Sequence, residues 1–243
     1  MKNMMDYNEV TFNWADGHQY QPAPRHRRRL ISNILKNLPF DTCLDAGCAQ
    51  PHLLEILSKW NKDLYGCDVS HKVITANKEE FKHISFETMD ITKETYPGNK
   101  TFDLVICSEV IEHLDDWQSA VKNLSVMSKK YLLITVPSGK MNPIDGMLGH
   151  IRHFKGDELT REIEKNGFKV ILSRYWGFPV HSLYKFAINS VAPDKLYEKF
   201  AMSKFTPFKK IVCNILYYSF YINDLFKRGK QLILLAEKNN EAL

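Results

Sequence analysis

Short apolar runs alternate with helically spaced apolar positions along most of the chain. Seven runs have the apolar character of buried strands: residues 42–48, 63–69, 84–91, 102–107, 130–136, 168–175 and 231–237. Helical spacing marks other segments, at residues 25–38, 53–57, 71–81, from about 116, and 157–166. Because strands that alternate with helices form parallel sheets, this pattern predicts an α/β protein with a doubly wound sheet.

Two segments depart from the alternation. Residues 1–24 are polar and aromatic, and we expect them to form an arm. About fifty residues between the last two runs have the pattern of two or three helices, the clearest of which begins at Thr206-Pro207. One face of that helix is apolar: Phe208, Ile211, Val212, Ile215 and Leu216. We expect this face to pack on the domain, with a membrane-surface role as the alternative.

Composition is compatible with one packed domain. The 243 residues are 44% apolar and 25% charged, and a solvated surface explains the formal charge of +5 as readily as a polyanionic partner does. Three of the five cysteines, Cys43, Cys67 and Cys107, lie in apolar runs, and no CxxC or zinc-type spacing occurs. With no apolar N-terminal leader and no bilayer-length apolar stretch, we expect a cytoplasmic protein without a transmembrane segment.

Small residues follow the first strand-like run, in the sequence DAGCAQPH of residues 45–52. The second run closes on Asp68, about twenty residues further along, which is the layout of an adenosine-binding α/β half. Small residues such as Gly47 allow the backbone to approach a ligand closely, and a carboxylate past the second strand can accept from both ribose hydroxyls. A dinucleotide fingerprint is excluded, because Ala49 and His52 replace two of its three glycines.

Three further features make the pattern specific. The first is Asp90, which closes the third run. The second is a strand that leads into a polar turn, in the sequence FDLVICSEVIEHL of residues 102–114. The third is a last strand that follows a long crossover. With these, residues 40–175 and 230–238 resemble the Rossmann-like class I S-adenosylmethionine-dependent methyltransferases in their usual motif order. The resemblance implies a seven-stranded, mostly parallel sheet of order 3-2-1-4-5-7-6 with a helical insertion before the final strand.

The resemblance also implies a division of the chain and a cofactor site. One methyltransferase domain would span residues 1–243: an arm and helix (1–38), a Rossmann-like core (39–176), a helical substrate lid (177–229) and the final strand (230–238). S-adenosyl-L-methionine would be the cofactor, with its methionine part beside Gly47, its ribose on Asp68 and its adenine on Asp90. Ser108 and Glu109 would lie beneath the transferred methyl. The full set of implied cofactor-binding residues is Asp45, Gly47, Cys48, Ala49, Asp68, Val69, Asp90, Ile91, Ser108 and Glu109.

One departure from the family pattern concerns the loop itself. The family loop usually has the pattern Asp-x-Gly-x-Gly-x-Gly, whereas Ala49 and Pro51 occupy the second and third glycine positions here. Pro51 can begin a helix. Ala49 would cost roughly 1 kcal/mol at any positive φ, which leaves open a catalytically silent cofactor-binding protein.

Histidines in the loops after strands are the candidates for catalysis. Methyl transfer requires alignment of nucleophile and methyl, and a hydroxyl nucleophile also benefits from a general base. His113 follows the fourth strand, and His150 and His153 follow the fifth, although His113 could instead serve only its own turn. We therefore expect methyl transfer to an oxygen or nitrogen of a small-molecule or carrier-linked metabolite, of natural-product or envelope-glycan type.

The turn at Glu109 offers an alternative. Glu109, Glu112 and His113 resemble the metal-binding ExxEH of small-RNA 2′-O-methyltransferases and of some ubiquinone-pathway O-methyltransferases. Because the same pattern is frequent in methyltransferases that need no metal, we expect none here. No RRM or KH module is recognisable, which argues against RNA, and we expect no DNA partner. The basic cluster RHRRR at residues 25–29 is either a solvated face or a contact for an anionic substrate group.

Overall fold

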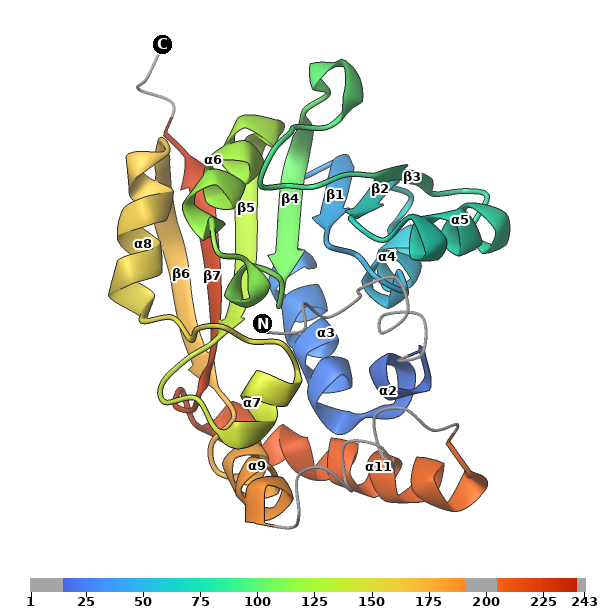
Figure 1. Ribbon diagram of the computed structural model, residues 1–243, viewed down its shortest axis with the longest axis vertical. Coiled ribbons are helices and arrows are strands. Elements are labelled where there is room, and N and C mark those ends of the chain that lie inside the picture. Colours follow the sequence, from blue (N-terminus) through green and yellow to red (C-terminus); the bar gives the residue numbers. More distant parts are fainter. Residues whose placement is uncertain (1–14, 191–204, 240–243) are drawn as a thin grey trace, which may run out of the picture.

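One seven-stranded sheet forms the centre of the molecule (Figure 1). The computed structural model describes residues 15–190 and 205–239. The strands are β1 (Thr42–Ala46), β2 (Asp63–Asp68), β3 (Ser85–Thr88), β4 (Phe102–Ser108), β5 (Ser128–Pro137), β6 (Phe168–Trp176) and β7 (Gln231–Lys238). Their order is β3-β2-β1-β4-β5-β7-β6, and β7 runs antiparallel to both neighbours while the other pairs are parallel. The predicted fold class and strand order are confirmed.

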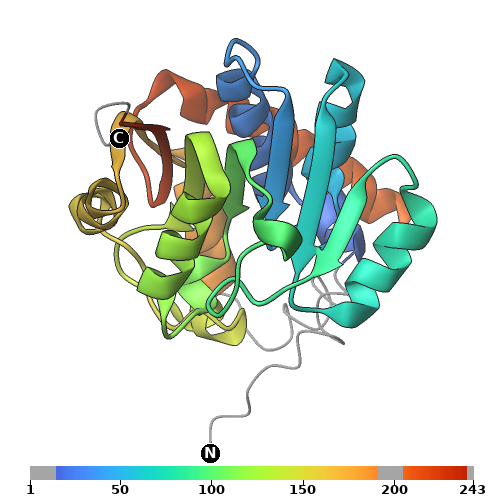
Figure 2. The same ribbon diagram turned by 90° about the horizontal axis from the view of Figure 1, so that it is seen from above.

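Helices cover both faces of this sheet (Figure 2). The α-helices are α2 (Ala15–Tyr20), α3 (Pro22–Leu35), α4 (His52–Leu57), α5 (His71–Glu80), α6 (Trp117–Met127), α7 (Pro143–Met147), α8 (Gly156–Lys165), α9 (Val180–Ser190) and α11 (Pro207–Ser219). Short 3₁₀ segments are η1 (Ser58–Trp60), η2 (Pro97–Asn99), η3 (Ile111–His113) and η5 (Phe220–Leu225).

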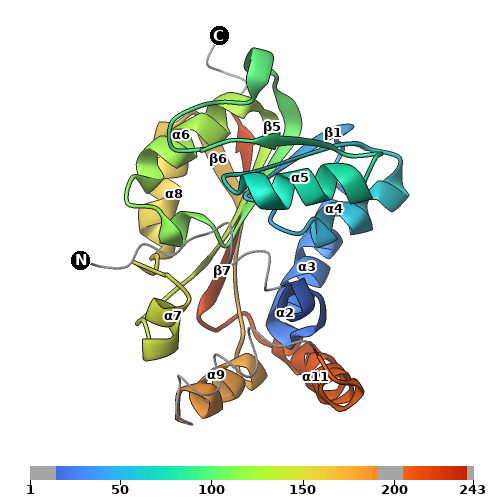
Figure 3. The same cartoon turned by 45° about the vertical axis from the view of Figure 1, so that its right-hand side comes forward.

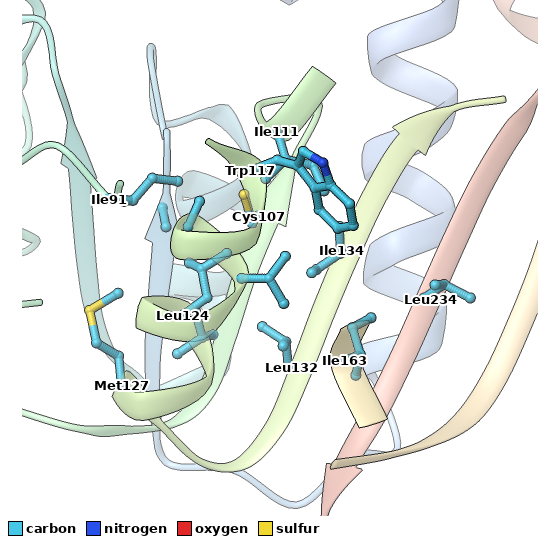
Figure 4. Close-up of a cluster of buried hydrophobic side chains, with 14 of the residues drawn as sticks. Ile91, Cys107, Ile111, Trp117, Leu124, Met127, Leu132, Ile134, Ile163 and Leu234 are labelled. Carbon is cyan, nitrogen blue, oxygen red and sulfur yellow. The ribbon is translucent and has the colours of Figure 1, made fainter. Parts of the chain in front are cut away.

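Each face of the sheet has its own hydrophobic core. Leu30 of α3 and Leu54 of α4 pack on one face with residues of β1 and β4. On the other face, Trp117 and Leu124 of α6 and Ile163 of α8 meet the side chains of β4, β5 and β7 (Figure 4). Because β4 is covered on both faces, every residue of it except the last is buried, as expected for a central parallel strand.

Two predicted boundaries were wrong. The expected arm contains α2, and α3 begins at Pro22 inside it, because proline has a φ suited to a helix start and lacks the N–H that would be unpaired there. The third strand, expected over 84–91, ends at Thr88. Asp90 therefore lies in the turn that follows the strand. Residues 1–14 of the expected arm lie outside the described residues.

The predicted helical insertion consists of α9, α11 and η5 in the described part of the chain. As predicted, Thr206 caps α11 by accepting a hydrogen bond from the Lys209 amide, and Pro207 is the first helical residue. The apolar face expected to pack on the domain does so only in part: Val212 and Leu216 are half-buried, whereas Phe208, Ile211 and Ile215 are 74%, 57% and 65% exposed. Other apolar residues of the same helix fill the inner side, where Cys213 is buried.

All five cysteines are free and buried. Burial raises the pKa of the Cys43, Cys48 and Cys107 thiols well above the usual value, so they behave as small apolar side chains. No helix in the two described ranges is long and apolar enough to cross a membrane.

Candidate functional site

The predicted site residues gather at one edge of the sheet. β1, β2, β4 and β5 are parallel, so their carboxyl ends lie at the same edge, where ligands bind in open α/β sheets. Beyond that edge lie α7, α9 and α11 (Figure 3). The predicted residues lie at the ends of these four strands and in the loops that follow them, except Asp90 and Ile91, which follow the parallel strand β3.

The loop between β1 and α4 is held by β2. The amides of Gly47 and Cys48 both donate to the carbonyl of Cys67, at 2.8 and 3.0 Å. The Asp68 carboxylate accepts from the Ala49 amide (3.0 Å) and, through its other oxygen, from the Ser70 amide (2.9 Å). Each oxygen retains a lone pair for a further donor. Asp68 is thus fixed in orientation while it remains able to bind a pair of hydroxyl groups.

Positive φ angles shape the same loop. Gly47 has φ +78°, and a Cβ built there would lie 2.3 Å from Val110 Cγ2. Ala49 has φ +43°, which confirms the positive φ considered for it from the sequence. The loop therefore has one position that only glycine can occupy and one at which alanine is tolerated with strain.

A matched pair of variants tests this difference. Gly47→Ala should destabilise the fold by about 2–4 kcal/mol, because it adds left-handed strain to a clash with a stiff β-branched side chain. Ala49→Gly should change stability by less than about 1 kcal/mol, because relief of strain offsets the greater entropy lost by glycine on folding. Urea unfolding measures both. Equal destabilisation by the two changes would contradict the assignment.

Asp45 is a buried acid at the end of β1. Its side chain is only 5% exposed, and burial together with the nearby Asp68 charge raises its pKa to about 7, against a lowering contribution from Arg27. Burial likewise raises the pKa of Asp68. The site therefore concentrates negative charge that is poorly compensated, which favours a cationic ligand group. Cys48 contributes only its backbone, since its thiol is buried under Gly66.

The residues expected to contact an adenine differ in how accessible they are to a ligand. Val69 is 54% exposed beside Asp68, so an exposed apolar side chain adjoins the carboxylate. Ile91 is buried. One Asp90 oxygen accepts from both the amide and the hydroxyl of Thr92, and the other pairs with Lys93 at 2.8 Å. These contacts lower the pKa of Asp90, and Lys93 would have to move for a ligand to reach that second oxygen.

Ser108 and Glu109 join a polar network at the end of β4. Glu109 has φ +58°, an uncommon conformation for a non-glycine residue that is frequent at functional sites. Its carboxylate accepts from the Thr135 hydroxyl (3.1 Å) and pairs with Arg27 of α3 (3.1 Å). Ser108 and Thr135 share a hydrogen bond of 2.9 Å. This network fixes the positions of the Ser108 and Glu109 side chains at the end of β4.

The three predicted histidines lie together. The His113 and His150 rings meet edge to face with centroids 4.8 Å apart, and His150 Nδ1 lies 3.3 Å from His153 Nε2. Burial lowers the pKa of all three, to about 3 for His150. At neutral pH the rings are therefore uncharged, which is the form that accepts a proton or binds a metal.

Two acids complete this cluster. Glu112 is fully buried, and burial with the neighbouring Glu109 charge raises its pKa well above the usual value. Asp145, also fully buried, pairs with Lys185 of α9 at 2.7 Å and with His153 at 3.5 Å. Ligand atoms of Glu112, His113 and His150 lie within 4.8 Å of one another, as do those of Asp145, His150 and His153. Glu109 is not in either group.

Several residues of this site were missed by sequence reasoning. Thr135 is the single hydroxyl residue among the apolar side chains of residues 132–136, and that polarity could have indicated it. Arg27 was visible only as part of a basic cluster, for which the alternatives were a solvated face and a contact for an anionic substrate group. Asp145 and Lys185 carry no local pattern, since their pairing depends on the packing of α9 against α7.

The basic cluster at residues 25–29 is divided among different partners. Arg27 pairs with Glu109, and Arg29 pairs with Asp224 of η5. His26 is fully buried against Trp176. Of the two interpretations of this cluster, the solvated face was wrong, because α3 lies between the sheet and α11, and the contact for an anionic substrate group stays a prediction.

A protein-family model described as "Methyltransferase domain" matches residues 17–173. A ubiquinone biosynthesis O-methyltransferase of Coxiella burnetii is 30% identical to this chain over 102 residues, which cover 40% of each protein. The chain thus matches less than half the length of that relative.

Solved structures share the fold at low identity. The N-methyltransferase NodS from Bradyrhizobium japonicum WM9, in complex with S-adenosyl-L-homocysteine, is 17% identical, with 97% of this chain and 98% of that chain covered and a TM-score of 0.59. The [4+2]-cyclase SpnF is 15% identical, with 96% and 93% covered and a TM-score of 0.64. These likenesses concern the fold, and SpnF shows that it also occurs in a protein named for another reaction.

Proposed function

We propose that this chain, which belongs to the class I S-adenosylmethionine-dependent methyltransferase family, methylates an oxygen or nitrogen of a small-molecule or carrier-linked metabolite. The family model matches more than half of the chain, and S-adenosylmethionine is the cofactor of the family. The observation that carries the proposal is the Asp68 carboxylate, oriented by two backbone amides beside the exposed Val69.

The residues present fit this cofactor. Asp68 can accept from two ribose hydroxyls, and Val69 offers an apolar surface to an adenine ring. The buried Asp45 suits the cationic part of the methionine moiety, where Gly47 leaves room for close backbone approach. Asp90 is the least prepared residue, because one of its oxygens accepts two hydrogen bonds from Thr92 and the other is paired with the Lys93 ammonium.

The bound cofactor supplies a methyl group on a sulfonium that already carries its leaving group. The chain supplies position: the Arg27–Glu109–Thr135 network would fix the floor below the methyl, and α9 would cover the acceptor as part of a lid. One imidazole of His113, His150 and His153 would take the proton of a hydroxyl acceptor. Exclusion of water and alignment can together provide about 7–11 kcal/mol of the barrier reduction.

Calorimetry with S-adenosyl-L-homocysteine and with NAD⁺ tests the cofactor assignment first. Transfer of a labelled methyl to acceptors with phenolic hydroxyl, sugar hydroxyl and amine groups then tests the reaction. His113→Gln, His150→Gln and His153→Gln are made one at a time, and the change that removes the base should lower transfer to hydroxyl acceptors about 10²–10⁴-fold while binding of S-adenosyl-L-homocysteine stays unchanged. His83→Gln, an exposed histidine distant from this edge, is the matched control. Tight binding of NAD⁺ alone would refute the proposal.

The buried acid at the end of β1 makes cofactor affinity depend on pH. The pKa of Asp45 is about 7, so it is protonated below and ionised above that pH, and a cationic ligand group favours the ionised form. Affinity for S-adenosyl-L-homocysteine should therefore rise between pH 6 and pH 8, by at most about tenfold per pH unit below the pKa. Asp45→Asn should flatten this dependence. Calorimetric titrations in two buffers would detect the proton that Asp45 releases when the ligand binds. An affinity of the wild-type protein that does not change with pH would contradict the prediction.

A second candidate is a metal-assisted O-methyltransferase of quinone or RNA 2′-O type. The ligand atoms of Glu112, His113 and His150, within 4.8 Å of one another, favour it, as does the likeness to ubiquinone biosynthesis O-methyltransferases. Two imidazoles and a carboxylate would suit a borderline divalent ion. This candidate predicts that a chelator abolishes transfer and that Glu112→Gln lowers the content of bound metal. Full activity in a metal-free preparation would exclude it.

A third candidate is a cofactor-binding protein without methyltransferase activity. The strained Ala49 and the fold shared with SpnF favour it. It predicts binding of S-adenosyl-L-homocysteine with no methyl transfer to any acceptor of the panel, whereas one labelled product would exclude it.

A further inference from the structure

An exposed apolar stripe runs along α11 and η5. Its members recur every three or four residues and are 46–79% exposed: Phe208, Ile211, Ile215, Tyr218, Ile222 and Leu225. Cys213 and Phe220 on the opposite side are buried, so the helix packs through one side and presents a second apolar side to solvent. A contiguous apolar surface of this kind marks an interaction site.

A basic cavity lies between α3 and α11, on the side of α11 that carries Tyr217. It has a volume of about 330 Å³ and is lined by Arg25, Arg28, Arg29 and Tyr217, among others. The Arg25 guanidinium lies 3.9 Å from the centre of the Tyr217 ring and donates to Asn214. Arg28 donates to the carbonyl of His18. Asp224 neutralises Arg29, whereas no ion pair among the described residues gives Arg25 or Arg28 a carboxylate.

The surroundings of the stripe are positively charged. Between residues 207 and 230 there are five basic residues and one acidic residue, Asp224, which is already paired with Arg29. Lys227, Arg228 and Lys230 are exposed directly after the stripe. A second copy of this chain would bring like charges together, which disfavours self-association through this surface. An anionic surface would match both the apolar stripe and its basic border.

We propose that the α11 face, comprising the stripe and the Arg25–Arg28 cavity, seats the protein on an anionic phospholipid bilayer. The apolar stripe enters the boundary between headgroups and acyl chains, and Arg25 and Arg28 bind lipid phosphate. The face lies on the same side as the carboxyl ends of the parallel strands (Figure 1), so a bilayer would adjoin the candidate site. Membrane binding requires no methyl transfer and stands independently of the proposed function.

Flotation of the full chain with unilamellar vesicles tests the proposal. Partition into an equal mixture of phosphatidylcholine and phosphatidylglycerol should exceed partition into phosphatidylcholine alone by at least about tenfold at low salt, and less at high salt. Ile211→Ser with Ile215→Ser should lower partition into both vesicles by about tenfold or more. Arg25→Gln with Arg28→Gln should remove the preference for the anionic lipid. Val126→Ser, at a 53% exposed position on α6, is the control and should change nothing.

Calorimetry with S-adenosyl-L-homocysteine on the same preparations separates this proposal from the proposed function. Binding of S-adenosyl-L-homocysteine without binding to vesicles would refute the membrane proposal alone. Binding to vesicles without binding of S-adenosyl-L-homocysteine would refute only the cofactor assignment. A dimer that the Ile211 and Ile215 changes dissociate would also overturn the membrane proposal, because the stripe would then be an interface between two copies.

Discussion

Asp68→Ala should weaken binding of S-adenosyl-L-homocysteine by about 10²–10⁴-fold, the largest loss expected from any single change at the candidate site. A hydrogen bond to a charged group contributes about 1.5–3 kcal/mol, and the carboxylate would provide two such bonds to a ribose. The change also removes the acceptors of the Ala49 and Ser70 amides, so the loop would lose its connection to β2.

Two controls isolate the ribose contribution. Asp68→Asn preserves the shape and one acceptor oxygen, and should lie between wild type and the alanine variant. Asp63→Ala removes an exposed carboxylate at the opposite end of β2 and should leave affinity unchanged. Calorimetry gives the affinities, and thermal unfolding shows whether each variant is folded. Unchanged affinity in a folded Asp68→Ala protein would place the cofactor elsewhere.

Lys185→Met should destabilise the protein by about 3–5 kcal/mol, because it leaves the fully buried Asp145 without its lysine partner. His153, at 3.5 Å, and the Asn142 amide, at 2.8 Å, cannot replace that charge at neutral pH. Since Lys185 belongs to α9 and Asp145 to α7, the loss should also loosen the lid over the candidate site.

The double variant Asp145→Asn with Lys185→Met should recover most of the lost stability, because no buried charge then remains unpaired. Arg161→Met, which breaks the exposed pair with Asp157, should cause no measurable change. Urea unfolding of the four proteins measures the differences. A loss for Lys185→Met as small as that for Arg161→Met would show that the lysine contributes little.

The centre of the sheet could be predicted because β4 and most of β5 are buried on both faces and therefore form continuous apolar runs. The end of each run locates the next loop, and this placed Gly47, Asp68 and Glu109 at one edge without any knowledge of their contacts. The predicted ends of helices and strands were wrong where local backbone chemistry, rather than hydrophobicity, determines where an element begins or ends. Pro22 at the start of α3 and the turn after Thr88 are the two cases.

Other features depend on tertiary packing and leave little trace in the sequence. His113, His150 and His153 could each be assigned to a loop, but only the structure brings their rings together. The helix α11 carries apolar residues on two sides, so periodicity shows that it is a helix without showing which side packs inward. The structure shows which side packs inward, because Tyr217 contacts Arg25 of α3 and Cys213 is buried.

The buried thiols divide into two groups whose rates of chemical labelling would report opening of different parts of the structure. Four lie in or beside the sheet, whereas Cys213 is covered only where α11 rests on the domain. A thiol-specific reagent would label Cys213 whenever α11 lifts, and the other four only when the sheet itself opens. The two labelling rates would therefore separate fluctuation of the lid from unfolding of the core, in the unmodified protein and without an added probe.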